Sequence, residues 1–204
     1  MMRLWLALPL VAATLFGAAC AEDATPTITP VPQACLAPGV DAGSSSNFPN
    51  VVEAMKSRHR ITVLAVGASS VGGRKGVRGA YYGLVEAFLE RTFKGLDVVI
   101  VQRGVSGELA RDVAERIRLE TARIQPDVVF WQVGTADAFA GIDPSEVAAT
   151  LRETIGWLRD RRVDTVLIGL HYSKSLARDP YYQAVRKAVA EVARTENVLK
   201  ISRY

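Results

Sequence analysis

Histidine and cysteine are scarce in this sequence of 204 residues, which contains two of each. The histidines are His59 and His171, and the cysteines are Cys20 and Cys35. So few ligands cannot form the His and Cys clusters that bind zinc and related ions, and we expect neither a metal nor a cofactor. If the chain is cleaved between Cys20 and Cys35, only one thiol remains, which excludes an intramolecular disulfide.

A long apolar run is also lacking. The most apolar segment, residues 4–16, is shorter than the 20 or so residues that a membrane-spanning helix needs. It follows the basic start MMR and precedes Ala19 and Ala21, which have the A-x-A spacing of a signal-peptidase site. We therefore expect a signal peptide over residues 1–21, export to the periplasm or outside the cell, and no transmembrane span.

Cys20 leaves a second reading of this N-terminus open. A cysteine just after an apolar segment is typical of a lipid-anchored protein, and lipid attachment at Cys20 would tether the chain to a membrane surface. Gly17, three residues earlier, is smaller than the aliphatic residue usually found there.

A strong excess of charge of one sign is absent as well. The net charge is +4, and arginine and glutamate alternate along the predicted helices instead of forming blocks. This pattern indicates a solvated surface and no nucleic-acid partner. We expect a monomer that acts on a small molecule.

Residues 22–58 are rich in proline, threonine and serine over most of their length and predict a linker. A short helix over residues 48–58 leads from this linker into a domain over residues 59–204. Within the domain, apolar runs alternate with segments of helical periodicity. The expected strands are 61–66, 96–102, 127–133, 164–170 and 198–202, and the expected helices are 80–93, 108–124, 143–160 and 180–195.

Strands that are apolar on both faces and alternate with helices predict a parallel sheet covered on both sides. The fold class is therefore α/β, a three-layer α/β/α sandwich with about five strands. Ligands of such sheets bind at the carboxyl ends of the strands. The turns expected at that rim are residues 67–73, 103–107, 134–138 and 171–173.

These turns carry groups suited to acyl transfer. The first offers Ser69, the second places Gly107 before a helix, and the third offers Gly134, Thr135 and Asp137. A serine beside backbone N–H groups can act as a nucleophile with part of an oxyanion hole.

The chain resembles the SGNH (GDSL-type) hydrolases, which are serine esterases and lipases on a flavodoxin-like sheet. Gly67-Ala68-Ser69 corresponds to the family's Gly-Asp-Ser block, and Gly107 in VSGE to its second block. Gly134-Thr135-Ala136-Asp137 corresponds to its Gly-x-Asn-Asp block. The resemblance covers residues 60–204 and implies the strand order 2-1-3-4-5.

The resemblance also implies roles. Ser69 holds the nucleophile position, the N–H groups of Ser69 and Gly107 form the oxyanion hole, and residues 134–137 line the substrate rim. The implied substrate is a small-molecule or glycan ester. For Asp137 two interpretations stay open: it supports the neighbouring site residues, or it caps the following segment.

Two departures bear on activity. Ala136 replaces the asparagine that donates to the oxyanion, and the loss of one such donor typically costs about 10²–10³ in rate. The fourth block, Asp-x-x-His, which supplies acid and base after the fifth strand, is absent, so we expect a C-terminally shortened member. His171, at the end of the fourth strand, is a candidate replacement base or simply a residue that contacts substrate.

Three functions follow. The first is an exported serine hydrolase acting on esters, with retention of activity left open. The second is a non-catalytic, degenerate domain that binds a ligand or partner at the same rim. The third, a nucleotide-binding domain, is disfavoured because G-x-G-x-x-G and G-K-[ST] are missing and Gln102-Arg103 ends the second strand. The G-x-S-x-G motif of α/β-hydrolases is missing too.

Overall fold

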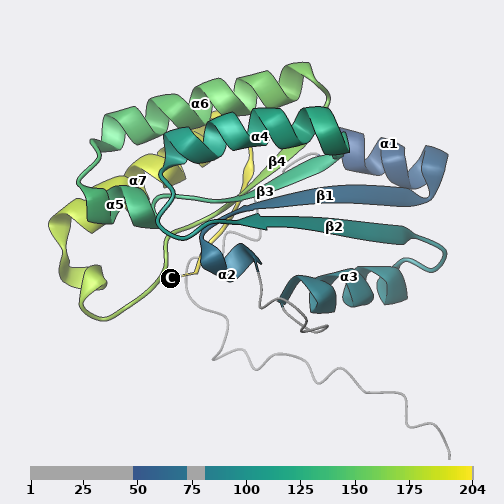
Figure 1. The fold of residues 1–204 in the computed structure, drawn as a ribbon, viewed down its shortest axis with the longest axis horizontal. Helices are drawn as coiled ribbons and strands as arrows, with labels where there is room; N and C mark the ends of the chain where they lie inside the picture. Colours follow the sequence, from purple (N-terminus) through teal and green to yellow (C-terminus); the bar gives the residue numbers. More distant parts are fainter. Residues whose placement is uncertain (1–47, 73–80, 204) are drawn as a thin grey trace, which may run out of the picture. The chain divides into compact units, whose positions relative to one another are not determined.

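A computed structural model of the chain describes residues 48–72 and 81–203. The predicted signal peptide, Cys20, Cys35 and most of the predicted linker lie outside the described residues. The folded unit alternates strands and helices as expected (Figure 1). The strands are β1 (Arg60–Gly67), β2 (Asp97–Gly104), β3 (Val128–Gln132), β4 (Asp164–Ile168) and β5 (Leu199–Ile201). The helices are α1 (Pro49–Arg58), α2 (Ser69–Gly72), α3 (Tyr81–Thr92), α4 (Ala110–Ile124), α5 (Thr135–Ala140), α6 (Pro144–Asp160), the 3-10 turn η2 (Leu176–Arg178) and α7 (Pro180–Thr195).

All five strands are parallel and lie in the order β2-β1-β3-β4-β5, which confirms the predicted fold and strand order. β1 and β3 are central and their residues are almost entirely buried, because helices cover both faces of the sheet. The carboxyl ends of all strands therefore meet at one rim, where α2 and α5 begin (Figure 1).

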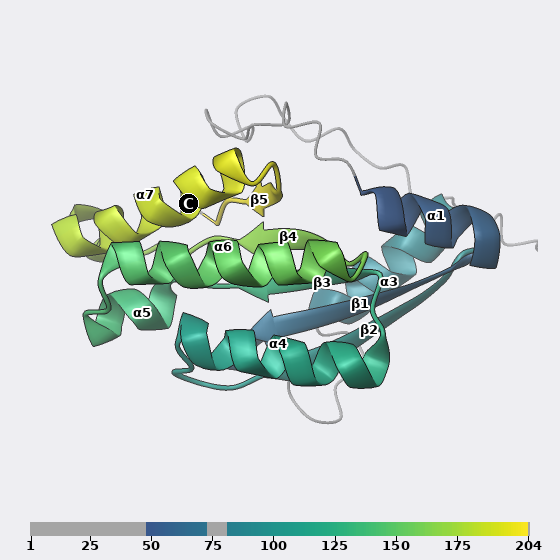
Figure 2. The same cartoon turned by 90° about the horizontal axis from the view of Figure 1, so that it is seen from above.

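The larger core layer lies between the sheet and helices α4, α6 and α7, which run alongside one another in Figure 2. Buried side chains at helical spacing on α4 and α6, such as Val113, Ile117, Leu151 and Ile155, contact Leu64, Val129 and Trp131 of the strands. The opposite face is covered by α1 and α3 through smaller clusters around Ile61, Val98 and Tyr82.

Helix α1 is fixed at the amino ends of the strands. At its start, the backbone N–H groups of Asn50 and Val51 donate to the Asp164 carboxylate at 3.1 and 2.9 Å. At its end, Arg58 forms an ion pair with Asp127, which precedes β3. Helix α1 thus contacts the sheet at both ends, although residues 49–58 fall within the segment predicted as a linker.

Two short helices were not expected. The first turn becomes helix α2, and the turn predicted over residues 134–138 is mostly helix α5. Both have fewer residues than the length at which helical periodicity can be recognised, so the hydrophobic pattern could not reveal them. Among the described residues, no helix is long and apolar enough to span a membrane.

Candidate functional site

The loop that carries Gly107 is hydrogen-bonded to both neighbouring turns. At its start, Val105 N–H donates to the Gly67 carbonyl at 2.9 Å. At its end, Ala110 N–H donates to Asp137 Oδ1 at 2.8 Å. The three turns matched to sequence blocks therefore form one connected structure at the carboxyl rim.

Ser69 lies at the tip of β1, on the solvent side of the rim. Gly67 ends the strand with φ +144°, and a Cβ there would lie 2.6 Å from Gln132 Cβ, so only glycine lets the chain turn here. Ser69 is exposed and is the first residue of α2. N–H groups in a helix's first turn have no intrahelical acceptor, so that of Ser69 is available to a ligand.

Gly107 is exposed and adopts φ +75°, a conformation that glycine reaches without strain. It lies three residues before the first residue of α4, Ala110. Nothing in the structure tests whether its N–H meets an oxyanion, and that role stays a prediction.

Asp137 is buried, with 2% of its surface exposed. Burial raises the pKa of its carboxyl, while hydrogen bonds from the backbone of Ala110, Asp137 and Gly134 oppose this shift. Its bond to Ala110 caps helix α4, which has no side-chain cap from its own N-cap residue Leu109. The bond to Ala110 fits the interpretation that Asp137 supports the neighbouring site residues, because it caps the preceding helix α4 and fixes the end of the Gly107 loop.

Gly134 and Thr135 place the start of α5 against β4 and α7. Gly134 has φ +98°, and a Cβ there would lie 2.6 Å from Leu170 Cδ1. Thr135 Oγ1 accepts the His171 N–H at 3.0 Å. These contacts bring the third and fourth turns together as the sequence predicted.

A cavity of about 20 Å³ lies beneath the rim, lined by residues of the first three turns including Ala68, Glu108, Thr135 and Ala136. The indole of Trp131 also lines it, and its buried Nε1–H has no hydrogen-bond partner among the described residues. The volume suits one water molecule. Ala136 contributes no polar side-chain atom to this space, as the sequence indicated.

His171 reaches the rim, but its imidazole is not paired with Ser69. The backbone is fixed on both sides, since its N–H bonds Thr135 and its carbonyl accepts the Tyr182 hydroxyl. The side chain is exposed, and in residues 48–72 and 81–203 no hydrogen bond joins it to Ser69. Its role as a base remains a prediction, because catalytic hydrogen bonds are often formed only when substrate is bound.

Two rim residues escaped the sequence analysis. Gln132 ends β3 and reaches Ser70, and Arg203 follows β5 and bonds the carbonyl of Gly169. The polar Gln132 at the end of an otherwise apolar strand was a usable signal. Arg203 gave none, because only the sheet brings it beside β3 and β4.

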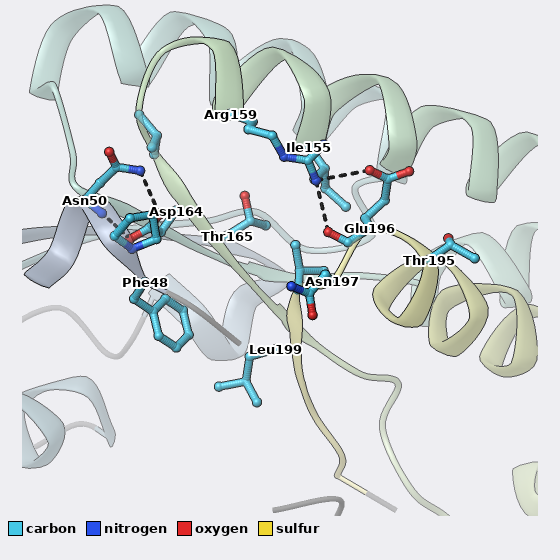
Figure 3. Close-up of a pocket in the computed structure, with 13 residues that line it drawn as sticks. Phe48, Asn50, Ile155, Arg159, Asp164, Thr165, Thr195, Glu196, Asn197 and Leu199 are labelled. Atoms are coloured by element: carbon cyan, nitrogen blue, oxygen red, sulfur yellow. Dashed lines mark hydrogen bonds and ion pairs between the residues drawn. The ribbon is translucent and has the colours of Figure 1, made fainter. Parts of the chain in front are cut away.

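A larger cavity lies away from this rim. Its volume is about 440 Å³, and it opens at the amino end of the sheet between α1 and the ends of α6 and α7 (Figure 3). Asn50 Nδ2 bonds Asp164 Oδ1 at 2.7 Å on one side, and Arg159 pairs with Glu196 at 3.1 Å on the other. No predicted site residue lines it. Within the described residues, no group of His, Cys, Asp and Glu could hold a metal ion.

Comparisons with known proteins agree with the fold. Residues 34–204 match the sequence profile of the Non-GDSL lipase-like family. Solved structures with a similar fold include AlinE4, an SGNH-hydrolase family esterase, with 21% identity, a TM-score of 0.60, and coverage of 70% of this chain and 75% of that one. No curated protein matches the sequence.

Two further structures are comparably similar. LAE5, an alpha/beta hydrolase enzyme from the metagenome of Lake Arreo in Spain, has 19% identity and a TM-score of 0.60 over 69% of this chain and 76% of its own. The psychrotrophic esterase EstA from Pseudoalteromonas sp. has 16% identity and a TM-score of 0.58, with coverage of 69% of this chain and 76% of its own. At these identities the likeness shows a shared fold.

Proposed function

Since the chain belongs to the Non-GDSL lipase-like family, we propose that it is an SGNH-type serine hydrolase that cleaves ester bonds with Ser69 as its nucleophile. The observation that carries the proposal is the position of Ser69. It begins a helix at the tip of the central strand β1, on the rim where the Gly107 loop is bonded to Gly67 and to Asp137.

The proposed reaction uses two steps. Ser69 Oγ attacks the ester carbonyl carbon and gives its proton to a base, for which His171 is the candidate. The N–H groups of Ser69 and Gly107 donate to the oxyanion. The intermediate then expels the alcohol, which takes the proton, and leaves an acyl-serine that water hydrolyses to a carboxylic acid and free Ser69.

The test is hydrolysis of 4-nitrophenyl acetate together with labelling by a fluorophosphonate. Ser69→Ala should abolish both, and mass spectrometry should find the label on Ser69. Ser175→Ala is the matched control, because Ser175 is an exposed serine in the segment after β4. Turnover and labelling that survive in Ser69→Ala would refute Ser69 as the nucleophile.

A second function, non-catalytic binding at the same rim, is favoured by two observations. Ala136 offers no side-chain donor, and the His171 imidazole is not bonded to Ser69 among the described residues. In that case the wild-type protein would neither turn over esters nor react with the fluorophosphonate. Binding of a glycan ester or small acyl ester would then be the same in wild type and Ser69→Ala.

We also propose that the chain is exported, on the strength of the basic start, the apolar segment 4–16 and the A-x-A site at Ala19 and Ala21. Expression in a bacterial host with a periplasm, followed by mass spectrometry of the mature N-terminus, tests this. Cleavage after Ala21 gives a chain that starts at Glu22. A chain that starts at a lipid-modified Cys20 is the anchored alternative, and an uncleaved chain in the cytoplasm contradicts export.

A further inference from the structure

Arg203 places a positive charge at the rim, next to Gln132 at the end of β3. It follows β5, whose last residue Ile201 accepts the N–H of Gly169 at 2.9 Å and so fixes the chain next to the end of β4. Arg203 Nε then donates to the Gly169 carbonyl at 2.8 Å.

Gln132 connects the guanidinium to the serine pair. In the amide orientation that satisfies both neighbours, Gln132 Oε1 accepts from Nη2 and Nη1 of Arg203 at 3.1 and 3.2 Å. Its Nε2 donates to Ser70 Oγ at 3.1 Å. One amide group therefore separates the cation from Ser70, the residue that follows Ser69.

The guanidinium retains donors that these contacts do not use. Each terminal nitrogen of an arginine carries two hydrogens, and only one from each is needed for Gln132. Within the described part of the chain, no carboxylate lies within ion-pair distance of Arg203. The ionisable groups that interact with it are the phenols of Tyr82 and Tyr182.

The guanidinium is partly buried. Burial lowers the pKa of Arg203 from its ordinary value, and burial also raises the pKa of Tyr82 to about 12. A half-buried guanidinium has lost part of its solvation, and the Gly169 carbonyl and the Gln132 amide, which are both uncharged, replace only some of it. An anion with oxygen acceptors would supply the missing charge and accept the remaining N–H donors.

We propose that Arg203, positioned by Gln132 and Gly169, binds an anionic oxygen group, a carboxylate or a phosphate, on the ligand that occupies the rim. This proposal rests on the proposed function. The substrate is then an ester that carries a carboxylate or a phosphate near its scissile bond. The reaction at Ser69 is unchanged, and Arg203 selects which ester is held there.

Direct binding tests the site without any turnover. Ser69→Ala protein is titrated by calorimetry with succinate and with inorganic phosphate, and with succinamide as the uncharged counterpart. We expect one anion to bind and succinamide not to bind. Arg203→Gln in the same Ser69→Ala background should lower the affinity for that anion at least tenfold. Whichever anion binds identifies the group as carboxylate or phosphate.

Arg123→Gln is the matched control, since Arg123 lies in the last turn of α4 at the opposite rim and its side chain is 78% exposed. It removes the same charge and should leave anion affinity unchanged. Thermal unfolding checks that Arg203→Gln is folded, and Arg203→Lys, which keeps the charge, should retain part of the affinity. Equal anion binding in Arg203→Gln and its parent, or no anion binding in either, overturns the proposal.

A kinetic arm separates this proposal from the proposed function. With Ser69 present, mono-4-nitrophenyl succinate is compared with neutral 4-nitrophenyl acetate. Arg203→Gln should lower kcat/KM for the charged ester at least tenfold more than for the acetate. Equal losses on both esters would show that Arg203 only supports Gln132 and would overturn the anion site. If neither ester is hydrolysed by the wild type, hydrolysis fails as the function while the binding experiment still decides the anion site.

Discussion

Asp137 Oδ1 accepts the backbone N–H of Ala110 at 2.8 Å, and this bond joins the third sequence block to the helix that follows Gly107. The carboxylate caps helix α4 from outside that helix, because Leu109 at the N-cap has no side-chain acceptor. The same bond fixes the end of the Gly107 loop, so one buried side chain contributes both to stability and to the shape of the rim.

Replacement of Asp137 by alanine should therefore affect folding and activity together. We expect a loss of about 1–3 kcal/mol in the free energy of unfolding, since a cap is lost and the Ala110 N–H is left without an acceptor. Ester turnover should fall more than the unfolded fraction explains. Asp143→Ala is the control, because Asp143 caps α6 through Ser145 at 2.7 Å, is exposed, and should lose about 1 kcal/mol with kcat retained. Equal losses of kcat in the two variants would argue against a positioning role.

The pH dependence of stability offers a separate test of Asp137. Burial raises the pKa of its carboxyl above the ordinary value of 3.8, so folding favours the protonated form. Its contribution to stability is then greatest below the unfolded pKa and is lost as pH rises through the folded pKa.

Asp137→Asn keeps an acceptor for Ala110 and does not titrate. Urea unfolding is measured from about pH 4 to about pH 7. The free energy of unfolding of Asp137→Asn, relative to that of the wild type, should rise with pH. Burial likewise raises the pKa of Asp164, but Asp164 is present in both proteins and cancels in the difference. If this difference in the free energy of unfolding stays constant or falls as pH rises, the raised pKa of Asp137 is contradicted.

Gly67→Ala should be strongly destabilising. The new Cβ would lie 2.6 Å from Gln132 Cβ and 2.9 Å from its carbonyl oxygen, at φ +144°. We expect a loss of about 3 kcal/mol from strain and overpacking. Gly83→Ala in α3, where a Cβ meets nothing within 4 Å, should instead gain about 0.5–1 kcal/mol. Chemical denaturation of both variants checks this, and similar changes in the two would refute the close-contact explanation.

Ala136→Asn should increase ester hydrolysis if the rim is catalytic. The resemblance of its sequence block to Gly-x-Asn-Asp puts Ala136 at the position of the asparagine donor, and Ala136 lines the small cavity beside Ala68. A restored side-chain N–H that reaches the oxyanion should raise kcat about tenfold or more. The measurement is kcat on 4-nitrophenyl acetate, with Ala136→Leu as a control of similar size that has no donor. A rise in the leucine variant, or none in the asparagine variant, would contradict an oxyanion hole at this position.

Much of the fold was predictable from local sequence. The β-branched run at residues 61–66 and the helical spacing in residues 143–160 gave β1 and α6 to within one or two residues at each end. Helix α4 was expected to begin at Glu108 and begins at Ala110. The reason for that difference is not local, because the acceptor that satisfies the first N–H of α4 is Asp137 on another element.

The rim was predictable in part. That Ser69, Gly107 and the Gly134–Asp137 turn meet follows from the parallel sheet, since each succeeds a strand. The contact between Gln132 and Arg203 could not be predicted, because these residues are far apart in sequence and neither belongs to a motif.

The sequence by itself determined the alternation of strands and helices, the three turns with their serine and glycines, and the alanine in place of an oxyanion donor. These are properties of residue type and spacing, which each segment carries alone. Only the tertiary structure decided that Asp137 caps α4, that His171 is fixed through its backbone, and that Arg203 lies beside Gln132. Such contacts join separate elements, and their geometry is set by how helices and strands pack around the sheet.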